Sequence, residues 1–183
     1  MRLTINGKIG AGKGTVADYL AKKLGLKYYG MGQMRRELAK ERGMTIAEFN
    51  KLGEKESWTD TLVDDFQRKL AEKDNFIADG RLSWYFIPNS IKVFLTVDPK
   101  IGAKRVIEAG RSEERFSNID GAIKGIIERG KSDVRRYSKI YGIKDVYGLK
   151  NYDIIVDTSD FSINQMGKAV EKAILDFSMR NIL

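Results

Sequence analysis

A run of nine residues near the N-terminus, Gly7 to Thr15, has the spacing G-x-x-x-x-G-K. Glycines at this spacing let successive backbone N–H groups turn toward one anion, and a helix that begins directly afterwards adds partial positive charge. A lysine at the end of such a loop reaches the terminal phosphates of a nucleotide. The full spacing, between an apolar run and a helical pattern, argues against a glycine turn that binds nothing. The residues expected to bind phosphate are Gly7, Gly10, Ala11, Gly12, Lys13, Gly14 and Thr15.

This loop departs from the general pattern at one position, because Gly14 stands where a serine or threonine usually binds magnesium. Thr15 offers the next hydroxyl. Asp79 follows the apolar run N-F-I-A and could hold a water of the ion, although an ordinary turn is the alternative for Asp79-Gly80. Since Mg²⁺ gives up its waters reluctantly, we predict that Thr15 and Asp79 bind it through water.

Arginines at two further places could neutralise a transferring phosphoryl group. Arg81 follows Asp79-Gly80 at the predicted carboxyl edge of a parallel sheet, where ligands bind in open α/β folds. Arg129, Asp133 and Arg136 have the spacing i, i+4, i+7 and share one helix face. The alternative is a solvated face with an Arg129–Asp133 ion pair worth a few tenths of a kcal/mol. Beside a phosphate loop, the stripe favours a lid that closes over the substrate.

A second arginine pair, Arg35 and Arg36, follows a predicted turn at Gly30–Gly32. A glycine turn, a helix N-terminus and an arginine together suit a second phosphate. For Arg35 we favour a solvated helix face instead.

The elements that must position these residues alternate between strands and helices. We predict strands over residues 2–6, 27–29, 75–78, 91–97 and 154–156, and helices over 13–24, 34–42, 60–72, 98–109, 120–141 and 163–179, with a further helix opening at 45–48. Alternation of this kind indicates a parallel sheet covered by helices on both faces. On the helix over 60–72, the predicted apolar stripe is Leu62, Val63, Phe66 and Leu70.

Two charged helical blocks interrupt the alternation and are interpreted as substrate-clamping insertions. We therefore expect one domain over residues 1–183, with a core over 1–29, 75–109 and 143–183, an insertion over 30–74 and a lid over 110–142.

The composition excludes several classes of chemistry. Among 183 residues there is no cysteine and no histidine, so disulfides, thiolate zinc sites, cysteine nucleophiles and Ser-His-Asp triads are excluded. The net charge is +8, from 33 Lys and Arg against 25 Asp and Glu, which favours anionic partners. No apolar run has the length of a membrane span and no signal peptide pattern occurs, so we expect a cytoplasmic protein. We also expect a monomer.

The absence of an obvious general base limits which chemical group can accept the phosphoryl group. A hydroxyl acceptor usually needs a general base, and the chain has no histidine and no obvious catalytic aspartate. A phosphate monoester has a second pKa of about 6, so its oxygens are nucleophilic at neutral pH. Phosphate-to-phosphate transfer is therefore favoured, although Asp79 could serve a hydroxyl substrate.

Together these motifs resemble the nucleoside monophosphate kinases, and within them the cytidylate kinases of the short, archaeal-like type. The resemblance spans nearly the whole chain. It rests on the loop at 7–15, G-Q-M-R-R-E-L at 32–38, D-G-R-L at 79–82, the spaced triplet Arg129, Asp133 and Arg136, R-R-Y at 135–137 with I-Y-G-I at 140–143, and Y-D-I-I-V-D-T-S at 152–159.

The resemblance implies a three-layer α/β P-loop kinase fold with helical insertions for monophosphate binding and for a lid. It implies ATP as donor, with Mg²⁺, and CMP or dCMP as acceptor. The acceptor side would consist of Arg36, Arg81, Asp133 and Gly32, and the catalytic set of Lys13, Arg81, Arg129 and Arg136. Lys13 and the loop amides would bind ATP phosphates, and Arg36 and Arg81 the acceptor phosphate. Arg129 and Arg136 would bridge both substrates, while Asp133 would orient the lid or the acceptor ribose.

Recognition of the base stays open. Longer bacterial cytidylate kinases read the pyrimidine with a serine and an aspartate, and the corresponding Met31 and Leu82 cannot make such hydrogen bonds. Candidates are Gln33, Ser83 and residues 45–72. A related kinase for AMP, UMP, dephospho-coenzyme A or a metabolite alcohol is one alternative. A basic nucleotide-binding protein that binds RNA is another, although no nucleic-acid motif supports it.

Overall fold

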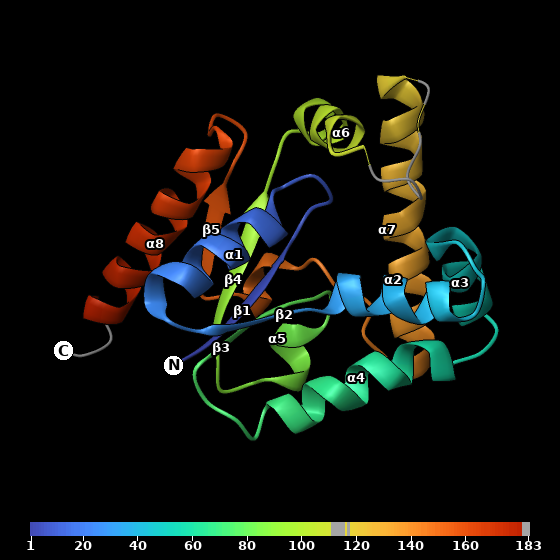
Figure 1. Cartoon of the computed structure of the whole chain (residues 1–183), viewed down its shortest axis with the longest axis horizontal. Helices are drawn as coiled ribbons and strands as arrows, with labels where there is room; N and C mark the ends of the chain where they lie inside the picture. Colours follow the sequence, from blue (N-terminus) through green and yellow to red (C-terminus); the bar gives the residue numbers. More distant parts are fainter. Residues whose placement is uncertain (111–115, 117, 181–183) are drawn as a thin grey trace.

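The centre of the computed structural model, which describes residues 1–110, 116 and 118–180, is a five-stranded sheet. Its strands are β1 (Arg2–Gly7), β2 (Lys27–Gly30), β3 (Phe76–Asp79), β4 (Ile91–Thr96) and β5 (Ile154–Asp157). They lie in the order β2-β3-β1-β4-β5, and every neighbouring pair is parallel (Figure 1). All five strands were predicted, to within two residues at each end.

Helices cover both faces of the sheet, as predicted. Ile77 belongs to an apolar cluster with α1 (Lys13–Leu24) and α8 (Ile163–Arg180). Its neighbours Phe76 and Ala78 point to the other face and pack with residues of α4 (Trp58–Leu70), α5 (Ser83–Phe86) and α7 (Ile119–Tyr141). The chain is therefore a three-layer α/β structure.

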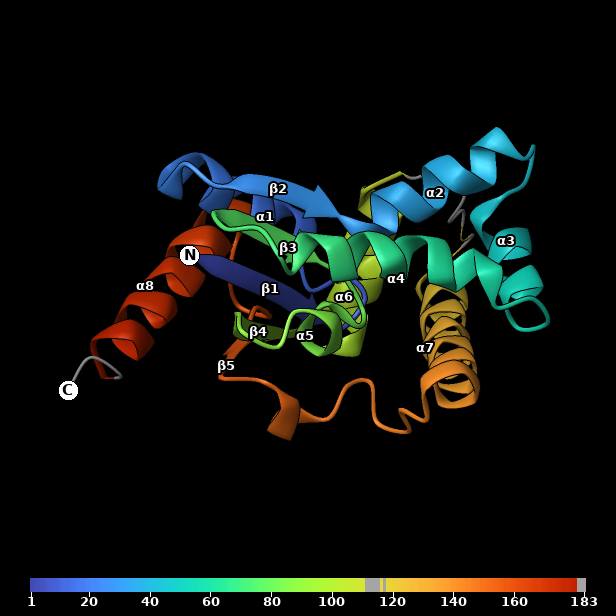
Figure 2. The same ribbon diagram turned by 90° about the horizontal axis from the view of Figure 1, so that it is seen from below.

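The remaining helices extend the fold beyond the sheet. They are α2 (Met31–Glu41), α3 (Ile46–Gly53), α6 (Pro99–Glu108) and the 3₁₀ turn η1 (Leu149–Asn151). In Figure 2 the strand arrows point toward the side where α2, α3 and α7 lie. The helical insertions therefore stand at the carboxyl ends of the strands, where ligands bind in parallel sheets.

Helix ends follow local chemistry. Gly25 ends α1 in the left-handed region, with φ of 64°. Thr45 and Glu48 form the capping box expected at the start of α3, and the Asp98 side chain caps α6. The predicted turn over Gly30–Gly32 is wrong, because α2 begins directly at Met31. Met31 is buried beside Gly80, and this burial brings the helix start to the end of β2.

The predicted apolar stripe of α4 is wrong at one position. Leu62 is 44% exposed, whereas Asp60, Asp64 and Gln67 are buried together with Val63. One side of α4 therefore carries polar groups into the interior. The short elements α5 and η1 were not predicted. Within the described residues, no helix combines the length and the apolar character that crossing a membrane requires.

The phosphate loop is held against α6 by a contact between two backbones. Gly10 has φ of 84°, and a Cβ there would lie 2.3 Å from the carbonyl oxygen of Gly102. Only glycine allows this approach together with this backbone conformation.

Replacing Gly10 with alanine should therefore lower the free energy of unfolding by at least about 3 kcal/mol, since it combines left-handed strain with a backbone clash. Gly43→Ala is the matched control, because Gly43 also has positive φ, 66°, with nothing within 4 Å of a new Cβ. That variant should lose only about 1 kcal/mol. Urea unfolding measures both losses, and equal losses would show that the packing against α6 is not what requires Gly10.

Candidate active site

A cavity of about 410 Å³ opens at the carboxyl ends of the strands. It is lined by the phosphate loop, α2, α4, the segment after β3, α6 and α7. Residues predicted from the sequence that line it are Gly10, Gly12, Lys13, Gly14, Thr15, Gly32, Arg36, Asp79, Arg81, Arg129, Asp133 and Arg136. The structure thus brings together groups that lie more than 120 positions apart in the chain.

Lys13 sits at the mouth of the loop and contacts the loop's own backbone. Its Nζ donates hydrogen bonds to the carbonyl oxygens of Gly7 at 3.1 Å and Lys8 at 2.8 Å. Burial lowers the pKa of Lys13 to about 7, and the charge of Arg81 acts in the same direction against that of Asp79. The ammonium is therefore poised to bind an anion that would restore its ordinary pKa.

Gly7 and Ala11 do not line the cavity. Gly7 ends β1, and the methyl group of Ala11 is buried in the apolar core. The N–H of Ala11 donates to the Lys8 carbonyl at 3.3 Å, and its own carbonyl accepts from Thr158 Oγ1 at 3.1 Å. Both residues shape the loop through the backbone, and their contact with phosphate stays a prediction.

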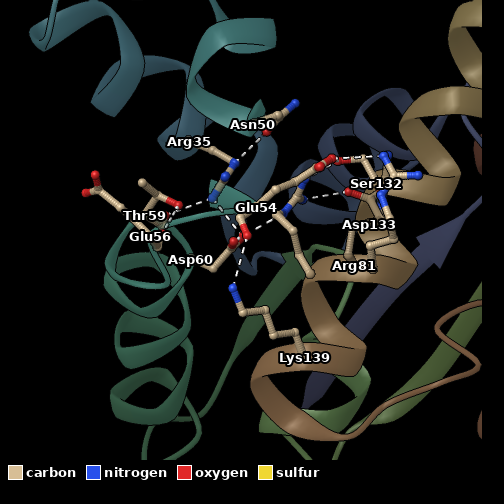
Figure 3. Close-up of polar contacts among 12 residues, drawn as sticks. Arg35, Asn50, Glu54, Glu56, Thr59, Asp60, Arg81, Ser132, Asp133 and Lys139 are labelled. Atoms are coloured by element: carbon tan, nitrogen blue, oxygen red, sulfur yellow. Dashed lines mark hydrogen bonds and ion pairs between the residues drawn. The ribbon is translucent and has the colours of Figure 1, made fainter. Parts of the chain in front are cut away.

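Asp133 is the centre of a buried ionic network (Figure 3). Its Oδ2 accepts from Arg81 Nε at 2.9 Å and from the Tyr147 hydroxyl at 2.8 Å. Its Oδ1 accepts from Arg136 Nη2 at 2.8 Å. Burial raises the pKa of Asp133, but Arg81 and Arg136 outweigh it and hold that pKa at about 2. The alternative of a solvated helix face therefore does not hold at Asp133, which is a buried carboxylate that fixes two catalytic candidates.

Arg136 continues the network to the insertion. Its side chain is 2% exposed, and its Nε forms an ion pair with Asp60 Oδ2 at 3.1 Å without hydrogen-bond geometry. Arg35 Nη1 binds the other oxygen of Asp60 at 2.8 Å. The expectation of a solvated Arg35 is therefore wrong. Its guanidinium lies over the Phe49 ring, 4.9 Å from the centroid, because that face of α2 packs on α3 and α4.

The end of α3 and helix α7 are also joined to each other. Glu54, at the end of α3, accepts from Ser132 Oγ at 2.6 Å and from Arg135 Nη2 at 2.9 Å, both on α7 (Figure 3). Lys139 reaches the Glu54 carbonyl at 3.3 Å. The hydrogen bonds from Ser132 and Arg135 lower the pKa of Glu54, so this link is made by an ionised carboxylate.

Helix α4 adds a polar edge that the sequence did not reveal. Gln67 Nε2 donates to Asp64 Oδ1 at 2.9 Å, and Tyr141 donates to Asp64 Oδ2 at 2.8 Å. Ser83 Oγ donates to Gln67 Oε1 at 2.6 Å. The one signal available was the spacing i, i+4, i+7 of Asp60, Asp64 and Gln67, which places them on one helix face.

Arg105 on α6 was also missed. Its Nη2 donates to the carbonyl oxygens of Thr158 at 2.8 Å and Phe161 at 2.9 Å. The Thr158 hydroxyl donates in turn to the Ala11 carbonyl. Arg105 therefore fixes the loop after β5 against the phosphate loop.

The residues predicted for magnesium suit an ion held mostly by water and phosphate. Asp79 is half-buried and accepts a hydrogen bond from Tyr28 at 3.3 Å, while Thr15 is exposed. Both line the cavity. In the described part of the chain, no group of three or more carboxylates could enclose a metal. A single carboxylate beside a phosphate loop fits Mg²⁺, which keeps several waters and binds substrate phosphates.

A family model and the curated relatives of this chain agree on one family. Residues 2–160 match the model of the cytidylate kinase-like family. The chain is similar to cytidylate kinases of Methanocaldococcus jannaschii, at 37% identity over 95% of this chain and 97% of the relative, and of Archaeoglobus fulgidus, at 33% over 95% and 94%.

Solved structures with lower identity show the same fold. An uncharacterised protein of Eubacterium ventriosum superposes with a TM-score of 0.65 at 21% identity, covering 94% of this chain and 96% of that one. A shikimate kinase of Bacteroides thetaiotaomicron gives 0.64 at 19% identity, covering 95% and 98%. The predicted P-loop kinase fold is therefore confirmed.

Removing the charge of Asp133 should destabilise the protein strongly. Asp133→Asn leaves Arg81 and Arg136 buried with one compensating charge fewer, which should lower the free energy of unfolding at pH 7 by about 3–5 kcal/mol. Asp65→Asn is the control, since Asp65 is 61% exposed in a surface pair with Arg68 and should change stability by under about 0.5 kcal/mol.

The pH dependence gives a second test of the same network. The folded-state pKa of about 2 lies below the ordinary value of 3.8, so Asp133 stabilises the protein above that value. This contribution is lost as the pH falls from about 4 through about 2. Between pH 5 and pH 2, the free energy of unfolding measured with denaturant should therefore fall less steeply with pH for Asp133→Asn than for the wild type. An unchanged slope would mean that this carboxylate is not the group held ionised.

Proposed function

The chain belongs to the cytidylate kinase-like family, and from this premise we propose that it transfers the γ-phosphoryl group of ATP to the phosphate of CMP or dCMP. Relatives that match along 94% or more of their own length bear the name cytidylate kinase. The observation that carries the proposal is the convergence of the phosphate loop, its lysine and the arginines of three separate segments on one cavity. All of these groups come from one chain, so the proposed site needs no second subunit, and we propose that the protein acts as a monomer in the cytoplasm.

On the donor side, the loop amides at Gly12 and Gly14 and the Lys13 ammonium bind the β- and γ-phosphates. Mg²⁺, when bound, neutralises charge on those phosphate oxygens. Thr15 and Asp79 are the residues that would hold the waters of this ion at the edge of the loop.

On the acceptor side, Arg36 and Arg81 hold the monophosphate, and Gly32 lies beside Arg36, whose Nη1 would be 3.7 Å from a Cβ at that position. An oxygen of that phosphate attacks the γ-phosphorus, and the bond to the ADP oxygen breaks. No general base is needed because the attacking oxygen is already deprotonated at neutral pH. Arg129 and Arg136 neutralise the charge shared between the two substrates.

Of the two roles that the resemblance implied for Asp133, orienting the lid fits its contacts better than orienting the acceptor ribose. Asp133 is 3% exposed, and both of its oxygens are used by protein donors. We assign it as a positioning residue for Arg81 and Arg136 rather than a ribose contact. Segments 30–74 and 110–142 act as the insertions that close over the substrates and exclude water. Residues 111–115 and 117 of the second segment lie outside the described residues.

A panel of acceptors tests the proposal. ADP formation from ATP and Mg²⁺ should be fast with CMP or dCMP and slow with UMP, AMP, GMP or no acceptor. Lys13→Ala should lower kcat by about a hundredfold or more, since it removes a charge aimed at the transferred group. Equal rates across the panel, at the level of the blank, would refute the proposed acceptor. A near-normal rate in Lys13→Ala would refute the assigned site.

Nucleotide binding should take up a proton near pH 8. Because the pKa of Lys13 is about 7 in the empty site, the group is mostly neutral at pH 8 and becomes charged beside phosphate. Titration calorimetry of ATP binding in buffers of high and low ionisation enthalpy measures this uptake. The number of protons taken up per bound ATP should approach one at pH 8 and fall to near zero at pH 6. It should also be near zero in Lys13→Ala. The same uptake in that variant would assign the proton to another group.

A further inference from the structure

The polar edge of α4 is placed where an acceptor base would lie. Asp64, Gln67 and Val63 line the same cavity as Arg36 and Arg81. A Cβ at Gly80 would lie 2.5 Å from Ser83 Oγ and 2.7 Å from Met31 Cγ, so these two side chains flank the backbone that presents Arg81. Ser83 then reaches Gln67. The edge on α4 and Arg81 therefore line one cavity and are connected through the segment 80–83.

The orientation of the Gln67 amide is fixed from both sides. Ser83 donates to Oε1, so Nε2 faces Asp64 and donates one hydrogen to it. A carboxamide nitrogen has two hydrogens, and each carboxylate oxygen has two acceptor sites. The second N–H of Gln67 and the unused lone pairs of Asp64 thus form a donor next to an acceptor, 2.9 Å apart.

We propose that Asp64 and Gln67 read the Watson–Crick edge of the acceptor cytosine: the carboxylate accepts from the 4-amino group, and the amide donates to N3. This inference rests on the proposed function and names the residues that select its acceptor. Ser83 and Tyr141 are positioning residues, since each holds one member of the pair. Met31 and Val63 supply the apolar walls between which the base lies.

The same pair rejects uracil by its chemistry. Uracil presents a carbonyl at position 4 and an N–H at N3, which is the reverse pattern. Its O4 would face a carboxylate oxygen, and its N3–H would face an N–H. Buried groups left unpaired in this way give discrimination of about ten- to a hundredfold.

The other candidates from the sequence fit less well. Gln33 lines the same cavity, but its side chain is exposed and its amide nitrogen donates to Glu37 at 3.0 Å. Asp60 is occupied by Arg35 and Arg136. Asp64 and Gln67, by contrast, are buried in the cavity wall and are held by Ser83, Tyr141 and each other.

Ionisation of Asp64 maintains the arrangement. The pKa of Asp64 is raised to about 7, mainly by burial and also by the charge of Asp60, against the lowering effects of the Tyr141 hydrogen bond, Arg68 and Arg35. An N–H donated by the base favours the ionised form. Below about pH 7 the protonated carboxyl can donate to the neighbouring amide, which can then turn over. Selectivity for CMP over UMP should therefore fall as the pH is lowered from 8 to 6.

The decisive experiment compares kcat/KM for CMP and UMP at pH 8. Asp64→Asn should lower the CMP/UMP ratio by about tenfold or more, because a carboxamide can present either N–H or C=O to the base. The matched control is Asp65→Asn, one residue along the same helix on the exposed side, and its ratio should stay within about twofold of the wild type. An unchanged ratio in Asp64→Asn would overturn the inference.

A second measurement needs no substitution, so it does not depend on the variant folding. The monophosphate of pyrimidin-2-one riboside lacks the 4-amino group of cytosine. The wild-type protein should use it at least about tenfold less efficiently than CMP. Equal use would overturn the reading of the amino group. If the wild-type protein phosphorylates CMP but both tests contradict the expected results, only the assignment of Asp64 and Gln67 to base recognition is refuted. A chain with no nucleotide acceptor at all refutes the proposed function and this inference together.

Discussion

One buried carboxylate holds the catalytic half of this protein together. The cavity must present several guanidinium groups to phosphates, and in its empty state those cations would repel one another in a poorly solvated place. Asp133 resolves this by binding Arg81, which follows the sheet, and Arg136, which belongs to α7. Asp60 does the same for Arg136 and Arg35. The arginines are thereby fixed before any substrate arrives, and the insertions are attached to the core.

The same balance explains why Lys13 differs from its neighbours. Arg81 and Arg136 have carboxylate partners at hydrogen-bond distance, whereas Lys13 contacts two backbone carbonyls. Carbonyl dipoles offset a buried charge less completely than a carboxylate does, so its pKa falls to about 7. Lys13, whose charge can change near neutral pH, therefore lies where the donor phosphates bind. Arg81 and Arg136, whose charge and position are fixed, lie where they must be aligned with the substrates.

Much of this architecture could be predicted because it depends on local rules. The loop at 7–15, the caps at Gly25, Thr45 and Asp98 and the apolar strands each follow from neighbouring residues. The polar edge of α4 and the burial of Arg35 could not be predicted in this way. Arg35 and Asp64 are polar residues on helices, a pattern that usually indicates a solvated face, and they are buried because residues far along the chain supply their partners. The burial predicted for Leu62 is wrong for the same reason. The distant residues that bind Asp60, Asp64 and Gln67 determine which side of α4 faces inward.

The link through Glu54 has a mechanical consequence. This residue ends α3 and accepts hydrogen bonds from Ser132 and Arg135, which lie on α7. A displacement of one insertion therefore pulls on the other as long as the three side chains stay in contact. We therefore expect α3 and α7 to move together, so that both substrates are enclosed or released in one conformational change.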